Sequence, residues 1–154
     1  MNKAVDRQII NKVLPYFNSS VDKSHVSPLG NGLINATFLV KNPTQTFVLQ
    51  RINEHVFKQP EEVVNNAELI NQHLVGKQRQ GHYSLSPIWQ LPSTDDQPFT
   101  QVDEGYWRAI QFIPNCYTVE SVEAPAQAKQ VAASFGEFTS ALSDFPAERL
   151  DMVI

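Results

Sequence analysis

The spacing of apolar residues near the N-terminus predicts a helix. Apolar side chains recur every three or four positions within residues 1–18, at Ile9, Ile10, Val13, Leu14 and Phe17. This spacing places them on one face of an amphipathic helix of roughly four turns. We expect this helix to end before the polar segment NSSVDKS and to pack by its apolar face.

From His25 onward the pattern changes to short runs in which apolar and polar residues alternate. A period of two is typical of strands that bury one face. Three such runs follow one another, namely HVSPLG, ATFLVK and TFVLQRI at 25–30, 36–41 and 46–52. Asn42 and Pro43 form a turn signal between the second and the third run. This part of the chain therefore predicts three antiparallel strands.

A second helix is predicted after these strands. Pro60, Glu61 and Glu62 suit the first turn of a helix, where a proline costs no hydrogen bond and acids face the positive end of the helix dipole. An apolar stripe then continues to Gly76, where we expect the helix to end. The stripe consists of Val63, Ala67, Ile70 and Leu74.

The rest of the chain predicts further strands and a last helix. SLSPIWQLP and PFTQV flank the turn-rich segment STDDQ, and GYWRAIQFIP is typical of a longer strand that stops at Pro114. An apolar stripe at helical spacing runs from about Pro125 to Leu142. The chain is therefore predicted to be α+β, with about five antiparallel strands, one inserted helix and a helix near each end.

The composition argues against several classes of function. Twelve Lys and Arg against 16 Asp and Glu give a net charge of -4, so no basic field favours nucleic acid or an anionic membrane as a partner. No apolar run approaches the ~20 residues that span a bilayer, and the N-terminus lacks the apolar core of a signal peptide. The single cysteine, Cys116, cannot form an internal disulfide. We expect a soluble, cytoplasmic protein.

Four segments in this order resemble the amino-terminal lobe of a kinase. They are GNGLINATFLV at 30–40, FVLQRINEHVFKQPEEV at 47–63, GYWRAIQFIP at 105–114 and FGEFTSAL at 135–142. Together they are similar to the aminoglycoside phosphotransferase and choline-kinase-like superfamily, and closest to its bacterial N-acetylhexosamine 1-kinase-like branch. The resemblance implies a nucleotide-binding lobe over residues 1–113, with the sheet and inserted helix at 25–113. It also implies an interlobe connector and the first helix of a second, truncated lobe over residues 114–154.

The first of these segments is the candidate phosphate-binding loop. In a kinase lobe the loop between the first two strands lies over the triphosphate, and glycines let backbone N–H groups approach the phosphate oxygens. By resemblance Gly30, Asn31 and Gly32 form this loop, while Asn35 and Thr37 add side-chain hydrogen bonds or shape the turn. Judged without its context, Gly-x-Gly is more often an ordinary hairpin than a nucleotide site.

The third strand departs from the kinase pattern. A kinase lobe presents a lysine from this strand to the α and β phosphates and pairs it with a glutamate of the following helix. Here Gln50 stands at or beside the lysine position and Arg51 follows it, and alternation prevents both from pointing into the cleft. Arg51 either supplies the missing charge or is a solvated charge at a strand edge. The glutamate partner stays open among Glu61, Glu62 and Glu68.

The segment that joins the lobes is the candidate adenine-binding site. In the resembling fold its backbone C=O and N–H groups bind the edge of the adenine. The corresponding residues here are Gln111, Phe112 and Ile113. Apolar candidates to line the base pocket are Val40, Leu49 and Ile110. Trp107 is expected to lie in the core or the pocket wall.

The resemblance implies that ATP or another nucleoside triphosphate binds here with Mg²⁺, which the second lobe mainly holds. That lobe would also supply the catalytic aspartate of a His-Gly-Asp-like loop. No such motif occurs before Ile154, and the four histidines show no metal-ligand spacing, so no residue here receives a catalytic or metal-binding role. We expect the nucleotide-binding part of a small-molecule kinase, inactive alone, whose parent phosphorylates a hydroxyl of an amino sugar or hexosamine.

The alternative is a non-catalytic kinase-like or α+β module that binds a partner. In either case the apolar stripe of the last helix would lack its cover, which predicts self-association.

Overall fold

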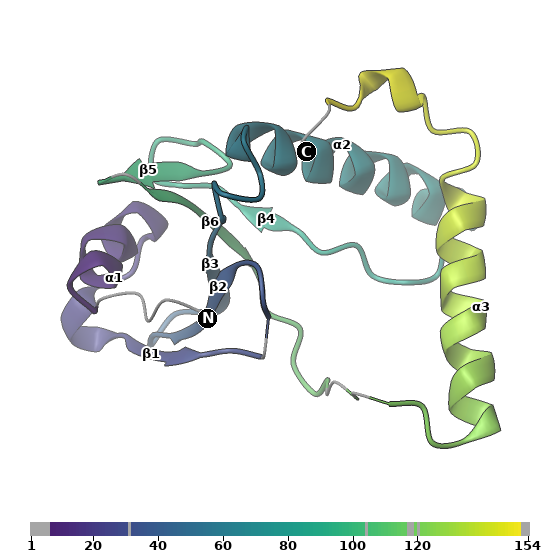
Figure 1. The fold of residues 1–154 in the computed structure, drawn as a ribbon, viewed down its shortest axis with the longest axis horizontal. Helices are drawn as coiled ribbons and strands as arrows, with labels where there is room; N and C mark the ends of the chain where they lie inside the picture. The colour runs from purple at the N-terminus through teal and green to yellow at the C-terminus, as the bar shows by residue number, and fades with distance from the viewer. Residues whose placement is uncertain (1–6, 31, 104, 117–118, 120, 152–154) are drawn as a thin grey trace.

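The computed structural model describes residues 7–30, 32–103, 105–116, 119 and 121–151 (Figure 1). Within them the fold is α+β, with an open antiparallel sheet of six strands. The strands are β1 (His25–Pro28), β2 (Ala36–Lys41), β3 (Thr46–Arg51), β4 (Gln90–Leu91), β5 (Thr100–Val102) and β6 (Gly105–Gln111). The α-helices are α1 (Arg7–Val13), α2 (Pro60–Arg79) and α3 (Pro125–Ala141). Three 3₁₀ helices are η1 (Leu14–Phe17), η2 (Val21–Lys23) and η3 (Ala147–Arg149).

The strand order of the sheet is β1-β2-β3-β6-β4, with β5 also paired to β6. One edge of β6 pairs with β3, from Phe47 opposite Gln111 to Arg51 opposite Trp107. The other edge of β6 is shared, because β4 and β5 pair with different parts of it. The inserted α2 therefore separates β3 from the strands that follow it, yet β3 and β6 are neighbours in the sheet.

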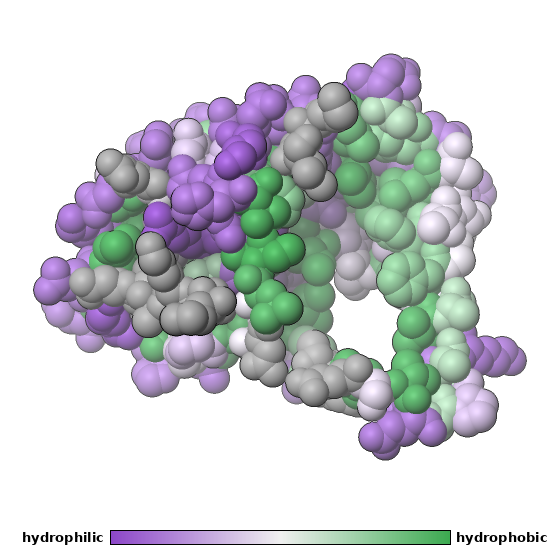
Figure 2. Space-filling model, in the orientation of Figure 1, coloured by the Kyte–Doolittle hydropathy of each residue, from purple (hydrophilic) through white to green (hydrophobic). Residues whose placement is uncertain are grey.

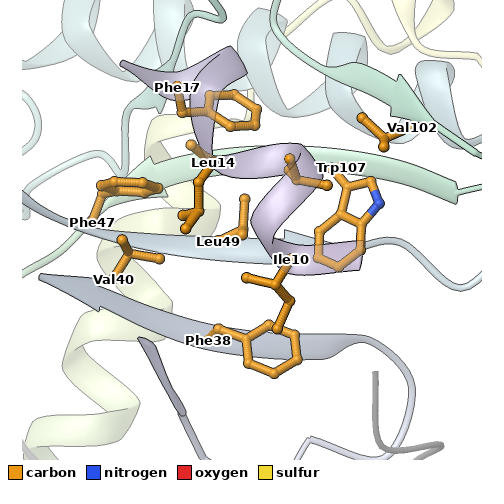
Figure 3. Close-up of a cluster of buried hydrophobic side chains, with 11 residues drawn as sticks. Ile10, Leu14, Phe17, Phe38, Val40, Phe47, Leu49, Val102 and Trp107 are labelled. Atoms are coloured by element: carbon orange, nitrogen blue, oxygen red, sulfur yellow. The ribbon is translucent and has the colours of Figure 1, made fainter. Parts of the chain in front are cut away.

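The main core lies between α1, η1 and one face of the sheet. Figure 3 shows Ile10, Leu14 and Phe17 pointing onto the strands, among side chains from β2, β3 and β6. The buried cluster comprises Ile10, Val13, Leu14, Phe17, Phe38, Val40, Phe47, Leu49, Val102, Trp107 and Ala109. Trp107 is fully buried within it, as the sequence predicted. This core covers one face of the sheet.

The N-terminal helix ends earlier than predicted. A helix of roughly four turns was expected from the apolar spacing, but α1 ends at Val13 and the chain continues as η1. The reason is Pro15, which has no N–H to donate and whose ring would clash with the preceding turn of an α-helix. The tighter η1 accepts the proline near its start, and the expected apolar face is retained.

The second helix begins where predicted but does not end at Gly76. It runs from Pro60 to Arg79, and the glycine that ends it is Gly81, with a φ of 77°. His82 N–H donates to Lys77 C=O at 2.9 Å across this turn. A left-handed glycine just past a helix is the usual way to satisfy its last carbonyls. Gly76 lies inside the helix and was the wrong choice.

The sheet has six strands where about five were predicted, and one expected strand is nearly absent. Of the segment SLSPIWQLP only Gln90 and Leu91 form a strand, β4. Pro87 and Pro92 flank this pair, and a proline cannot donate to a ladder. In addition β5 occupies the rest of the β6 edge.

The last helix agrees with its predicted range and meets α2 at one end only. A second apolar cluster of Leu74, Tyr83 and Ala141 joins the C-terminal end of α3 to α2. Lys77 Nζ lies 2.6 Å from Asp144 Oδ2 beside this cluster. Figure 1 shows the remainder of α3 standing away from the sheet. Among the helices of the described residues, none has the length and apolar character to cross a membrane.

Candidate functional site

The loop between β1 and β2 closes at its base by a backbone hydrogen bond. Leu29 N–H donates to Thr37 C=O at 2.9 Å, one residue beyond β1. Gly30 has a φ of 71°, a conformation that L-residues rarely adopt, so a glycine is favoured there. Gly32 is not in this conformation, and a Cβ added to it would meet only Asn35 O at 3.6 Å. Asn31 lies outside the described residues.

Asn35 holds the far end of this loop. Its Oδ1 accepts a hydrogen bond of 2.9 Å from Asn53 N–H, and Asn53 Nδ2 donates to Ile34 C=O at 3.1 Å. The two bonds tie the loop to the segment that follows β3. Sequence reasoning included Asn35 but missed Asn53, because the contact depends on how β2 pairs with β3.

Three side chains form a hydrogen-bonded row on the face of the sheet opposite α1. Gln50 is paired with Thr37 of β2 and with Arg108 of β6. Gln50 Nε2 donates to Thr37 Oγ1 at 3.1 Å. Gln50 Oε1 accepts from Arg108 Nε at 3.0 Å and from Arg108 Nη2 at 2.8 Å. We call Thr37, Gln50 and Arg108 the polar row.

Arg108 carries a positive charge that no carboxylate neutralises among the described residues. The ion pairs there join Lys12 to Asp103, and Lys77 and His73 to Asp144. Arg108 is half-buried, and this burial lowers its pKa. A guanidinium remains protonated in proteins, so the polar row presents a cation with a neutral partner. Sequence reasoning missed Arg108, whose only signal was a charge at an alternating position of a predicted strand.

The structure separates Gln50 from Arg51 as alternation requires. Arg51 is paired with the buried Trp107, so it points to the α1 face. Its side chain lies beside Gly105, where an added Cβ would come within 2.8 Å of Arg51 Nε. Arg51 therefore lies on the other face of the sheet from the polar row.

None of the three candidate glutamates of α2 forms an ion pair within the part of the chain described. Glu68 Oε1 accepts a hydrogen bond of 3.1 Å from Gln72 Nε2. Glu61 and Glu62 each have a buried carboxylate oxygen without a hydrogen-bond partner among the described residues. Burial and the charges of Asp151 and Glu61 raise the pKa of Glu62. The cation–glutamate pair that the resemblance implies is thus not formed.

The connector after β6 leaves part of its backbone available. Gln111 N–H donates to Trp89 C=O at 2.8 Å, and Ile113 C=O accepts from Cys116 Sγ at 3.0 Å. Within the described residues, Phe112 makes no backbone hydrogen bond, and neither does the Ile113 N–H. These groups are one acceptor and two donors at the position proposed for adenine.

Two of the residues expected to line the base pocket lie elsewhere. Val40 and Leu49 are fully buried in the core under α1, so they cannot contact a ligand on the other face. The expectation was wrong because alternation alone does not say which face a helix covers. Ile110 shares the face of Arg108, and it is half-buried.

Figure 2 shows a hollow between the sheet and α3, with apolar residues gathered over α3 along its edge. Two of the α3 side chains, Val131 and Phe135, are 43% and 64% exposed. The predicted exposed stripe on the last helix is therefore confirmed.

No protein-family model matches this chain. No group of three or more His, Cys, Asp or Glu side chains within the described ranges is arranged to hold a metal ion.

Proposed function

We propose that this chain is the nucleotide-binding part of a small-molecule kinase, with residues 1–113 as the nucleotide lobe and 114–154 as the connector and first helix of a second lobe. The observation that carries the proposal is the polar row, which starts at the base of the glycine loop and ends at Arg108, an arginine that no described carboxylate neutralises. A loop with a left-handed glycine above a cation is suited to phosphate oxygens.

The ligand we propose is ATP or another nucleoside triphosphate with Mg²⁺. The triphosphate would lie under the described residues of 29–35, and the base would meet the backbone of Phe112 and Ile113. Thr37 adds a hydroxyl whose proton remains for donation, because its oxygen accepts from Gln50. By the sequence resemblance, Mg²⁺ would be held mainly by the phosphates and by a second lobe.

The acceptor of the parent enzyme is proposed from the sequence resemblance alone. It is a hydroxyl of an amino sugar or hexosamine, and the enzyme would act in the cytoplasm. The isolated chain should not turn over, since it lacks a His-Gly-Asp-like segment. Phosphoryl transfer by the purified chain would refute this part.

The experiment that tests the proposal is a thermal-stability titration with Mg-ATP of three proteins: wild type, Gly30→Ala and Gly81→Ala. Gly30 and Gly81 have φ values of 71° and 77°, and an added Cβ meets no atom within 4 Å at either. Both substitutions should cost roughly 1–2 kcal/mol, because an alanine is strained in this conformation. Gly81→Ala is thus a matched control far along the chain from the loop.

We expect both variants to lose the same stability without nucleotide, but only Gly30→Ala to bind Mg-ATP more weakly. Two results would contradict the proposal. One is the lack of saturable binding by the wild type at millimolar Mg-ATP, and the other is equal affinity of the two variants.

A second candidate function is a module that binds a protein partner, and it is favoured by the neutral Gln50 at or beside the position where a kinase lobe has its lysine. The exposed apolar side chains of α3 are expected under either function. The partner-binding module predicts no nucleotide binding. The same titration therefore separates the two functions.

A further inference from the structure

Arg108 is a charged side chain in an unusual position. It lies on an interior strand of the sheet, half-buried, and its only side-chain hydrogen-bond partner among the described residues is the neutral amide of Gln50. Charges that are fully buried in folded proteins are normally paired with an opposite charge, and the burial of Arg108 goes part of the way to that situation. The described residues supply no anion for this site, and a bound ligand is the partner that we consider here.

The place of Arg108 relative to the glycine loop suggests which anion this is. Thr37 closes the base of the loop through its C=O and begins the polar row through its hydroxyl. Neighbouring strands are about 4.8 Å apart, so the row covers roughly 10 Å from β2 to β6. A phosphate chain under the loop is within this span, and a guanidinium can bind two of its oxygens at once.

Gln50 orients the guanidinium for such a contact. An arginine carries only donors, so the amide of Gln50 must turn its oxygen toward Arg108 and its nitrogen toward Thr37. Of the five N–H donors of an arginine side chain, two reach Gln50 Oε1, which leaves three. The remaining donors have no partner among the described residues, and the guanidinium that carries them is held in place by two hydrogen bonds to Gln50.

We propose that Arg108 is the cation that binds the phosphates of the nucleotide in place of the missing strand lysine, and that Gln50 is its positioning residue. This inference rests on the proposed function. It assigns the positive charge to β6 and leaves β3 with a neutral side chain. Arg51, the only arginine of β3, has no part in it because it points to the α1 face.

The test compares the affinities of wild type, Arg108→Gln and Arg51→Gln for Mg-ATP, adenosine and inorganic triphosphate, measured by calorimetry. Arg108→Gln and Arg51→Gln remove the same charge from adjacent cross-strand pairs but from opposite faces of the sheet. We expect Arg108→Gln to weaken Mg-ATP and triphosphate binding by about tenfold or more, and Arg51→Gln to leave both within about twofold. Adenosine binding should not change in either variant. If Arg108 had only a structural role, its substitution would weaken the binding of adenosine as well.

A double variant, Gln50→Lys with Arg108→Gln, guards against misfolding of the single one. It moves the positive charge from β6 to the paired position on β3. The new ammonium at position 50 can then donate a hydrogen bond to the amide oxygen introduced at position 108. We expect it to recover most of the lost affinity for Mg-ATP. A melting temperature close to that of the wild type would show that each variant is folded.

The possible outcomes separate this inference from the function on which it rests. If the wild type binds Mg-ATP and Arg108→Gln binds it equally well, the assignment of Arg108 is overturned while nucleotide binding stands. If triphosphate binds through Arg108 but Mg-ATP binds no better than triphosphate, Arg108 is confirmed as a phosphate ligand and the nucleotide function is overturned. If the wild type binds neither at millimolar concentration, both are overturned.

Discussion

Replacing Gly32 with alanine should strengthen the fold and weaken the proposed site at the same time. The backbone of Gly32 is not left-handed, and an added Cβ makes only an ordinary contact of 3.6 Å with Asn35 O. An alanine that fits without strain stabilises a protein by about 0.4–1 kcal/mol, because it lowers the entropy of the unfolded chain. For a chain of this length that is a rise of roughly 1–4 °C in melting temperature.

The expected effect on the site has the opposite sign. A methyl group on the loop would keep phosphate oxygens from the backbone, and a hydrogen bond to a charged group contributes about 1.5–3 kcal/mol. At 1.4 kcal/mol per tenfold, the affinity for Mg-ATP should fall roughly 10- to 150-fold.

The assay is a pair of measurements on each protein, a thermal melt without ligand and a calorimetric titration with Mg-ATP. Gly76→Ala is the control, because Gly76 lies inside α2 and an added Cβ meets no atom within 4 Å. It should gain stability as a helical alanine does, and its affinity should not change. Unchanged affinity of Gly32→Ala, or a clear loss of its stability, would refute the reasoning.

Three further predictions concern the core, the α2–α3 junction and the exposed helix face. Leu14→Ala should lower the free energy of unfolding by about 2–5 kcal/mol in chemical denaturation, since Leu14 is fully buried in η1; a loss below about 1 kcal/mol would contradict its packing. The hydrogen bond from Lys77 lowers the pKa of the Asp144 carboxyl group below its ordinary value. The carboxylate therefore stabilises the fold at a pH above the pKa that it has in the unfolded chain, and this stabilisation is lost as the pH falls through the lower pKa of the folded protein. Wild type should therefore lose more melting temperature on acidification than Asp144→Asn, whereas parallel pH profiles would argue against the pair. Phe135→Ser should reduce self-association in sedimentation and leave the melting temperature nearly unchanged; undiminished association would show that this face is not responsible.

Local pattern was enough to predict most of the elements. The strands β2 and β3 lie within the predicted runs because both are rich in β-branched and aromatic residues and are bounded by turn signals. The start of α2 agreed because Pro60 and two acids mark a first turn. Errors arose where a single residue overrides a periodic pattern. Pro15 divides the first helix, and Gly81 ends the second.

The candidate site depended on information that local pattern does not carry. Gln50 and Arg108 are 58 positions apart in the chain and become neighbours only through the pairing of β3 with β6. Alternation correctly separated Gln50 from Arg51, but which face becomes the main core is decided by where α1 packs. This is why Val40 and Leu49 were assigned to a pocket and lie instead in the core.

The central claim, that the loop, the polar row and the connector form one nucleotide site, is tested most directly by a Mg-ATP titration of the isotope-labelled chain followed by backbone and side-chain chemical shifts. The account predicts saturable shifts at the described residues of 29–35, at Thr37, Gln50 and the Arg108 side chain, and at Phe112 and Ile113. The Arg51 side chain should not shift, because it lies on the other face of the sheet. Shifts confined to other parts of the chain, or none at millimolar Mg-ATP, would contradict the account.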